Sequence, residues 1–109
     1  MMILPQKSYG ENLKILIDSY HKEFKIPNLP FVFGQINCPP GKKYTEGVQI
    51  VRNEMENVAS TVKNTVMVKT DISVDWNHFR KDADNVHYNA EGQKRLGTAF
   101  ANAYLHVAQ

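Results

Sequence analysis

An aspartate and a histidine, Asp84 and His87, stand three residues apart just before a stretch with helical periodicity near the end of the chain. On so short a turn, the carboxylate can accept the proton of one imidazole nitrogen, which leaves the other nitrogen free and basic. This is the orienting acid and general base of hydrolytic triads, in which the acid fixes the tautomer and stabilises the imidazolium. Asp and His also occur at helix starts as ordinary capping residues, and the spacing alone is common.

The elements around the pair favour the chemical interpretation. Asn89 has the side chain of an N-cap and Glu91 suits the positive first turn, so a helix is predicted to begin here. Its predicted buried stripe comprises Leu96, Phe100, Ala103, Tyr104 and Val107. The pair therefore falls in the loop between a predicted strand and the last helix, and α/β proteins place their sites in loops beyond strand ends.

Two short apolar runs, at 31–36 and 65–70, predict strands. A helix is predicted between them at 45–62, with a stripe of Val48, Val51, Met55, Val58 and Val62 and with Arg52 off that stripe. A strand–helix–strand order makes a parallel pair joined by a crossover the default, and strands of parallel sheets are buried on both faces.

A first helix is predicted from the S-x-x-E pattern that begins at Ser8, which has the form of a capping box. Pro27 and Pro30 predict its end. Its predicted buried face comprises Leu13, Leu16, Ile17, Tyr20 and Phe24.

The predicted order is helix–strand–helix–strand–loop–helix, which is an α/β fold, and residues 1–109 are expected to form a single domain. Two parallel strands cannot form a fully covered sheet, so an apolar edge is expected to remain bare. We expect a homodimer across that edge, a complementary N-terminal chain, or a truncated product of marginal stability.

Composition narrows the class of protein. Hydrophobic residues at 42% and charged residues at 22% are ordinary for a soluble globular domain. The net charge of +2 is too small to indicate nucleic-acid binding. The apolar start stops at Pro5, too early for a signal peptide or a membrane span. The single cysteine, Cys38, excludes an internal disulfide and favours the cytoplasm, although a longer relative could be secreted.

The block from Asp84 to Leu105, DNVHYNAEGQKRLGTAFANAYL, resembles the last conserved block of SGNH-type esterases, most of all the sialate O-acetylesterase and acetylxylan esterase group. Upstream segments resemble that group in the same order: the helix with Tyr9, Leu13 and Ile17, the strand at 29–35, the helix with Val51 and Arg52, and the stretch at 68–71. The resemblance implies the C-terminal part of a three-layer α/β/α, flavodoxin-like domain that removes acetyl groups from sugars. By this resemblance His87 is the general base and Asp84 its partner, with no cofactor and no metal.

The nucleophile of such enzymes is expected to lie outside this chain. Their Gly- and Ser-containing block and oxyanion donors have no counterpart here, and no serine follows a strand in a Gly-flanked turn. The serines are Ser8, Ser19, Ser60 and Ser73. Cys38 is an alternative nucleophile, but it precedes two prolines and has no helix N-terminus to lower its pKa.

Three further residues are predicted to contact an acetylated carbohydrate substrate: Trp76, Phe79 and Gln35. The two aromatic rings could stack on a sugar, or could simply pin the loop onto the body of the protein. A rival metal site in the same loop would use Asp71, Asp75, His78, Asp82, Asp84 and His87, although these follow no recognised calcium or zinc spacing. The alternative function is a non-catalytic remnant or a carbohydrate-binding module.

Overall fold

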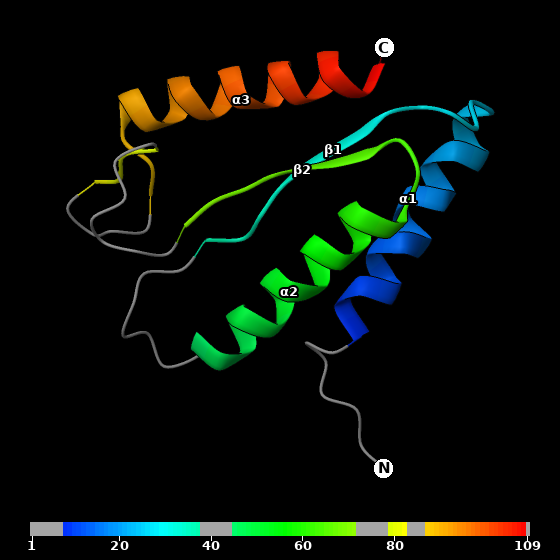
Figure 1. Ribbon diagram of the computed structural model, residues 1–109, viewed down its shortest axis with the longest axis horizontal. Coiled ribbons are helices and arrows are strands. Elements are labelled where there is room, and N and C mark those ends of the chain that lie inside the picture. The colour runs from blue at the N-terminus through cyan, green and yellow to red at the C-terminus, as the bar shows by residue number, and fades with distance from the viewer. Residues whose placement is uncertain (1–7, 38–44, 72–78, 83–86, 109) are drawn as a thin grey trace.

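The computed structural model describes residues 8–37, 45–71, 79–82 and 87–108 (Figure 1). The elements in order are α1 (Tyr9–Phe24), β1 (Phe31–Gly34), α2 (Thr45–Thr61), β2 (Thr65–Val68) and α3 (Ala90–Ala108). This is the predicted order, and the predicted α/β class is confirmed. None of the helices in these ranges has the length and hydropathy of a membrane-spanning segment.

The two strands form a parallel pair, as predicted, with Phe31 opposite Thr65 and Gly34 opposite Val68. Both strands are two residues shorter than the apolar runs suggested, because side chains take over the hydrogen bonding at their carboxyl ends. There the Thr70 N–H donates to the Gln35 side-chain oxygen at 3.1 Å instead of to a strand carbonyl.

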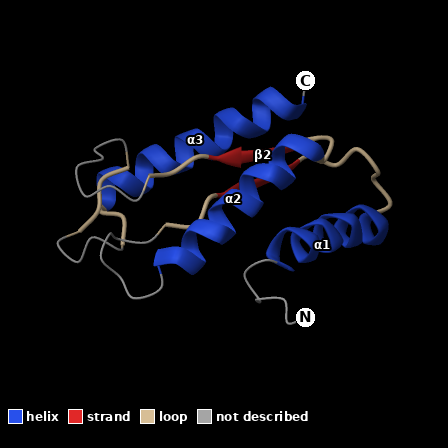
Figure 2. Cartoon of the chain, turned by 60° about the horizontal axis from the view of Figure 1, so that its bottom comes forward, coloured by secondary structure: helices blue, strands red, loops and turns tan. Residues whose placement is uncertain are grey.

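Helices cover both faces of the pair. α3 lies along one side, and α1 and α2 lie on the other, where they pack against each other (Figures 1 and 2). The core on the α1/α2 side is built on Leu13, Ile17 and Val58. On the α3 side, a Cβ at Gly34 would lie 3.1 Å from the Phe100 ring, so the missing side chain lets α3 approach the strand closely.

The predicted buried face of α1 is only partly correct. Leu13 and Ile17 are buried, whereas Leu16, Tyr20 and Phe24 are 48%, 42% and 57% exposed. The covering elements reach only one flank of the apolar stripe, so the other flank stays in solvent. Two smaller expectations are also wrong: Tyr104 of α3 is exposed, and Ser8 occupies the N-cap of α1 without a side-chain capping bond.

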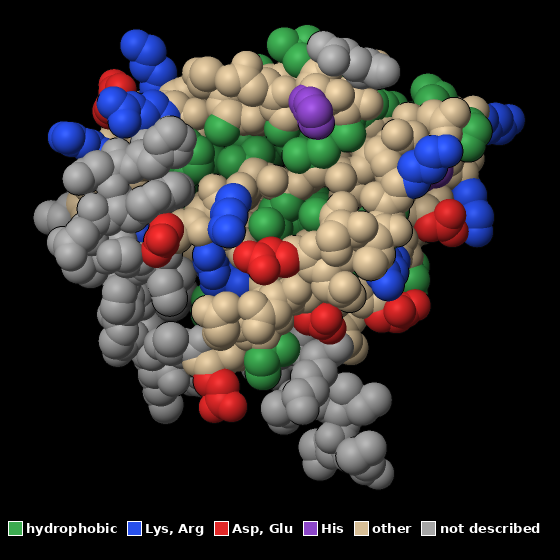
Figure 3. Space-filling view, viewed as in Figure 1, with side chains coloured by type: hydrophobic (Ala, Val, Ile, Leu, Met, Phe, Trp, Pro, Cys, Tyr) green, Lys and Arg blue, Asp and Glu red, His purple; other side chains and the backbone are tan. Residues whose placement is uncertain are grey.

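No third strand pairs with this sheet in the ranges that the structure describes, in line with the bare edge expected from the sequence. In the space-filling view, apolar side chains are visible in the furrow between α3 and α2, with charged side chains around it (Figure 3). β1 is only half-buried along its whole length, rather than buried on both faces.

Candidate functional site

The carboxyl ends of β1 and β2 are joined by a buried hydrogen-bond network. The Gln35 backbone N–H donates to the Val68 carbonyl at 2.9 Å, which extends the ladder past the strand. The Gln35 side-chain amide donates to Glu56 Oε1 at 3.1 Å, and its oxygen accepts from Thr70. Gln35 and Thr70 are both 4% exposed, so the two strand ends form a fixed platform.

Arg52 of α2 links the two strand ends by hydrogen bonds. Its guanidinium donates to the Ile36 carbonyl at 2.6 Å, to the Thr70 carbonyl at 2.6 Å and to the Thr70 hydroxyl at 2.8 Å. Arg52 is 7% exposed. The guanidinium is a planar fork of donors, so it can reach acceptors on two strands at once. The ammonium of a lysine has its donors on one nitrogen and could not span both strands.

Two short segments, 80–82 and 87–89, pair with each other directly before α3, and we call them the hairpin. Lys81 and Tyr88 form an antiparallel bridge, and the Asp82 N–H donates to the His87 carbonyl at 2.8 Å. Lys81 also extends toward the end of β2, where its ammonium donates to the Asp71 carbonyl at 3.4 Å. Hydrogen bonds therefore connect the two segments of the hairpin to each other and to the end of β2.

The start of α3 is fastened to the same hairpin. Asn89 is the N-cap that the sequence predicted, because its side-chain oxygen accepts from the Gly92 N–H at 2.8 Å. The Asn89 N–H donates to the Arg80 carbonyl at 2.8 Å. Gly92 is buried, and a Cβ there would lie 2.8 Å from the Arg80 nitrogen and closer still to its carbonyl oxygen. Only glycine allows the helix to approach this backbone so closely.

We expect Asn89→Ala to lower the free energy of unfolding by about 1 kcal/mol, because the Gly92 N–H loses its capping acceptor. The measurement is urea unfolding followed by circular dichroism. Asn89→Asp is the matched control, since its carboxylate can still accept that bond. Equal losses in the two variants would contradict the capping role.

His87 is exposed, and it lies on the hairpin two residues before the N-cap of α3. Its backbone is held by the bond to Asp82, so the ring is presented from a fixed segment at the carboxyl-end edge of the strands. Asp84, its predicted partner, lies outside the described residues, as does Trp76. The Asp84–His87 pairing therefore stays a prediction.

The two other predicted substrate contacts, Phe79 and Gln35, are both buried. Phe79 is 2% exposed and packs edge-on against Tyr88, with ring centroids 6.1 Å apart. The ring thus lies in the core, as the pinning alternative describes, and offers no open face for a sugar. The Gln35 amide is likewise occupied by Glu56 and Thr70.

Tyr88 brings a hydroxyl into the same region. Burial raises the pKa of Tyr88 above its ordinary value of 10.0, and the positive charge of Arg52 opposes part of that rise. The hydroxyl oxygen is buried and makes no hydrogen bond to the part of the chain that the structure describes. It therefore stays protonated at neutral pH and keeps its capacity to donate.

Sequence reasoning missed Arg52, Gly92 and Tyr88 as parts of this site. Arg52 lies off the apolar stripe of its helix, where a charged residue is normally solvated. Gly92 carries no signal in a single sequence, because its importance comes from a neighbouring backbone. The position of Tyr88 depends on its bridge with Lys81, which no periodic pattern in the sequence predicts.

The rival metal site gains no support from the described ranges. Within them, no group of three or more His, Cys, Asp or Glu side chains is placed to hold a metal ion. Asp71, Asp82 and His87 belong to these ranges, whereas the other three predicted ligands lie outside them.

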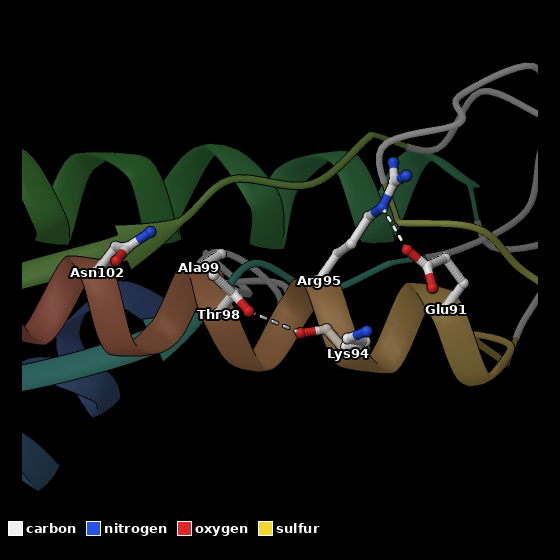
Figure 4. A pocket seen from close by; sticks show the side chains of 6 residues that line it. All are labelled: Glu91, Lys94, Arg95, Thr98, Ala99 and Asn102. Atoms are coloured by element: carbon white, nitrogen blue, oxygen red, sulfur yellow. Dashed lines mark hydrogen bonds and ion pairs between the residues drawn. The ribbon is translucent and has the colours of Figure 1, made fainter.

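A groove of about 380 Å³ runs along α3 next to its first turns (Figure 4). Its lining residues are Glu91, Lys94, Arg95, Thr98, Ala99 and Asn102. Arg95 Nε donates to Glu91 Oε1 at 3.0 Å, and the Thr98 hydroxyl donates to the Lys94 carbonyl at 3.1 Å. All the lining residues come from one helix, and these polar groups bond within it, so the groove is not assigned to the site.

Comparison with known proteins identifies the family to which the chain belongs. The model of the family described as carbohydrate esterase, sialic acid-specific acetylesterase, matches residues 4–106. No curated protein matches. Among solved structures, the X-ray structure of an Arabidopsis thaliana protein is similar, with 27% identity and a TM-score of 0.72. The match covers 93% of this chain but only 37% of that one, so the chain spans little more than a third of the matched structure.

Proposed function

Because the chain belongs to the sialic acid-specific acetylesterase family of carbohydrate esterases, we propose that it supplies the general base of a sugar O-acetylesterase. The residue that does this is His87, with Asp84 as the group that orients its ring. The family match carries the proposal. The exposed position of His87, on a hairpin fastened to both a strand end and a helix start, supports it.

The proposed reaction is acyl transfer in two steps. His87 takes the proton from a serine hydroxyl as that oxygen attacks the acetyl carbonyl, and then gives it to the departing sugar hydroxyl. A water molecule then attacks the acetyl-enzyme, again with His87 as base, and releases acetate and the free serine. Asp84 holds the tautomer and stabilises the imidazolium in both steps.

The serine is proposed to come from outside these 109 residues. Ser19 and Ser60 are exposed on helices and donate their hydroxyl protons to carbonyls of the preceding turn, Ile15 at 2.7 Å and Asn57 at 2.9 Å. Neither lies at a strand-to-helix turn, where a nucleophile would need to be. Ser8 begins α1, and Ser73 lies outside the described residues.

The test uses an activated acetyl ester and an O-acetylated sialic acid. We expect the isolated chain to release acetate hardly faster than buffer, because it lacks a nucleophile. Joined to a segment that carries the nucleophile, it should turn over, and His87→Ala should lower kcat by about 10⁶-fold. His106→Ala, an exposed histidine in the last turn of α3, is the control and should leave kcat unchanged.

Three results would contradict the proposal. Turnover by the isolated chain that is abolished by His87→Ala would disprove the missing nucleophile. Full activity of the joined form after His87→Ala would disprove the role of His87. If the joined form binds the acetylated sugar and never cleaves it, the alternative of a carbohydrate-binding module is the correct one.

A further inference from the structure

A pocket of about 460 Å³ lies at the amino ends of the two strands, at the end of the sheet opposite to the hairpin of His87. Three segments that are distant in the sequence form it: the approach to β1, the turn between α2 and β2, and the last turns of α3. Figures 1 and 2 show the carboxyl end of α3 on the side where the strands begin. The lining includes Asn28, Pro30, Lys63, Asn64, Tyr104 and Val107.

Asn64 is held firmly at the wall of this pocket. Its backbone is left-handed, with φ 58°, a conformation that Asn and Gly adopt more easily than other residues. Its carbonyl accepts from the Phe31 N–H at 3.0 Å, and its side-chain nitrogen donates to the Asn28 carbonyl at 3.5 Å. The side-chain oxygen accepts no hydrogen bond from the described part of the chain, so it can accept one from a bound molecule.

Tyr104 adds an aromatic ring to these polar groups. The sequence predicted this ring to be buried, but it is 51% exposed and borders the pocket. A tyrosine ring offers a flat apolar face and a polar tip. Around it lie the amides of Asn28 and Asn64 and the ammonium of Lys63, which can donate and accept hydrogen bonds. A saccharide suits this lining, because its C–H face can stack on the ring while its hydroxyls bond to the polar groups.

The charges around the pocket favour a neutral ligand. α2 ends at Thr61 and α3 ends at Ala108, so the carboxyl ends of two helices lie beside it. The last carbonyls of a helix carry partial negative charge. Lys63 is the only charged side chain among the described residues that line the pocket, and these carbonyls offset part of its attraction for an anion. A neutral hydroxyl can instead donate to a carbonyl and accept from the ammonium.

We propose that this pocket is a second saccharide-binding site, which holds a neutral sugar unit against Tyr104. Membership of a carbohydrate esterase family is the reason to choose a sugar among small molecules with such groups. Tyr104 lies fifteen residues after the N-cap Asn89, which is about 22 Å along a helix. The unit bound here is therefore a different part of a glycan from the one whose ester would reach His87, and the site does not depend on the role of that histidine.

The test is an NMR titration of the backbone amides of this chain. The probe is N-acetyllactosamine, a neutral disaccharide, and N-acetylneuraminic acid is the acidic comparison. We expect the disaccharide to cause saturable shift changes at Asn64, Tyr104 and Val107, with a Kd of about 1 mM. The acidic sugar should bind at these three residues at least about fivefold more weakly. His87→Ala should bind the disaccharide normally, so this proposal and the esterase proposal can fail separately.

Tyr104→Ala should raise the Kd at least about tenfold, because the stacking face is lost, whereas Tyr104→Phe keeps the ring and should stay within about threefold. Leu105→Ala is the matched control, since Leu105 is 58% exposed on the same turn but does not line the pocket. Asn64→Gly removes the amide and still permits the left-handed backbone. It should raise the Kd about fivefold and leave the midpoint of urea unfolding unchanged.

The inference is overturned by any of three outcomes. The first is the absence of saturable shift changes at Asn64 and Tyr104 up to about 50 mM disaccharide, a concentration far above the expected Kd. The second is equal weakening by Tyr104→Ala and Leu105→Ala, because the ring would then make no specific contact. The third is tighter binding of the acidic sugar than of the neutral one at this pocket, because Lys63 would then select an anion.

Discussion

Gly92→Ala is expected to lower the free energy of unfolding by about 3 kcal/mol, the upper part of the range for overpacking. The new methyl group would overlap the backbone of Arg80, at 2.8 Å from its nitrogen and 3.0 Å from its carbonyl carbon. A flexible side chain could move aside, but here a backbone must shift. The measurement is the midpoint of urea unfolding, converted with the slope of the transition.

Gly97→Ala provides the control in the same helix. A Cβ at Gly97 meets nothing within 4 Å. Alanine there should raise the free energy of unfolding by about 0.5–1 kcal/mol through helix propensity alone. Opposite signs for two identical substitutions, five residues apart, would establish that the cost at Gly92 comes from the contact with Arg80. If both variants were more stable than the parent protein, that contact would not exist in solution.

Gly92→Ala is also expected to displace the hairpin that carries His87. To relieve the overlap, Arg80 must move away from α3, and the Asn89–Arg80 hydrogen bond of 2.8 Å is then stretched or lost. The His87 ring is carried by the same hairpin. We therefore expect NMR shift changes at Lys81, His87 and Tyr88 in Gly92→Ala, and none of comparable size in Gly97→Ala.

Arg52→Ala is expected to lower the free energy of unfolding by roughly 3 kcal/mol, because buried acceptors lose a charged donor. The Ile36 carbonyl and both oxygens of Thr70 would lose bonds of 2.6–2.8 Å at the carboxyl ends of the two strands. Arg52→Lys should recover only part of this loss, since an ammonium cannot span the two strand ends with a planar fork. Chemical denaturation measures both.

Arg95→Ala is the control for Arg52→Ala. Arg95 forms an exposed ion pair with Glu91 one turn away on the same helix, at 3.0 Å. Its removal should cost no more than about 0.5 kcal/mol, the usual size for such pairs. If Arg52→Ala cost as little as Arg95→Ala, the guanidinium would not be the link between the strand ends.

Local pattern was sufficient for much of the fold. The apolar periodicity of α2, the two short apolar runs and the Asn89 cap predicted their elements correctly. The order of these elements also predicted the parallel pairing. These features depend on residues only a few positions apart, and the side-chain periods of 3.6 and 2 are fixed by helix and strand geometry.

The sequence by itself determined the helices, the strands, their order and the family to which the chain belongs. Only the tertiary structure decided that Arg52 is buried, that Phe79 lies in the core and that Leu16 stays in solvent. Each depends on what packs against the residue from a distant part of the chain. A periodic pattern predicts which face of α1 is apolar, but the area covered depends on the neighbouring elements. Among the described residues, these elements leave one flank of that face exposed.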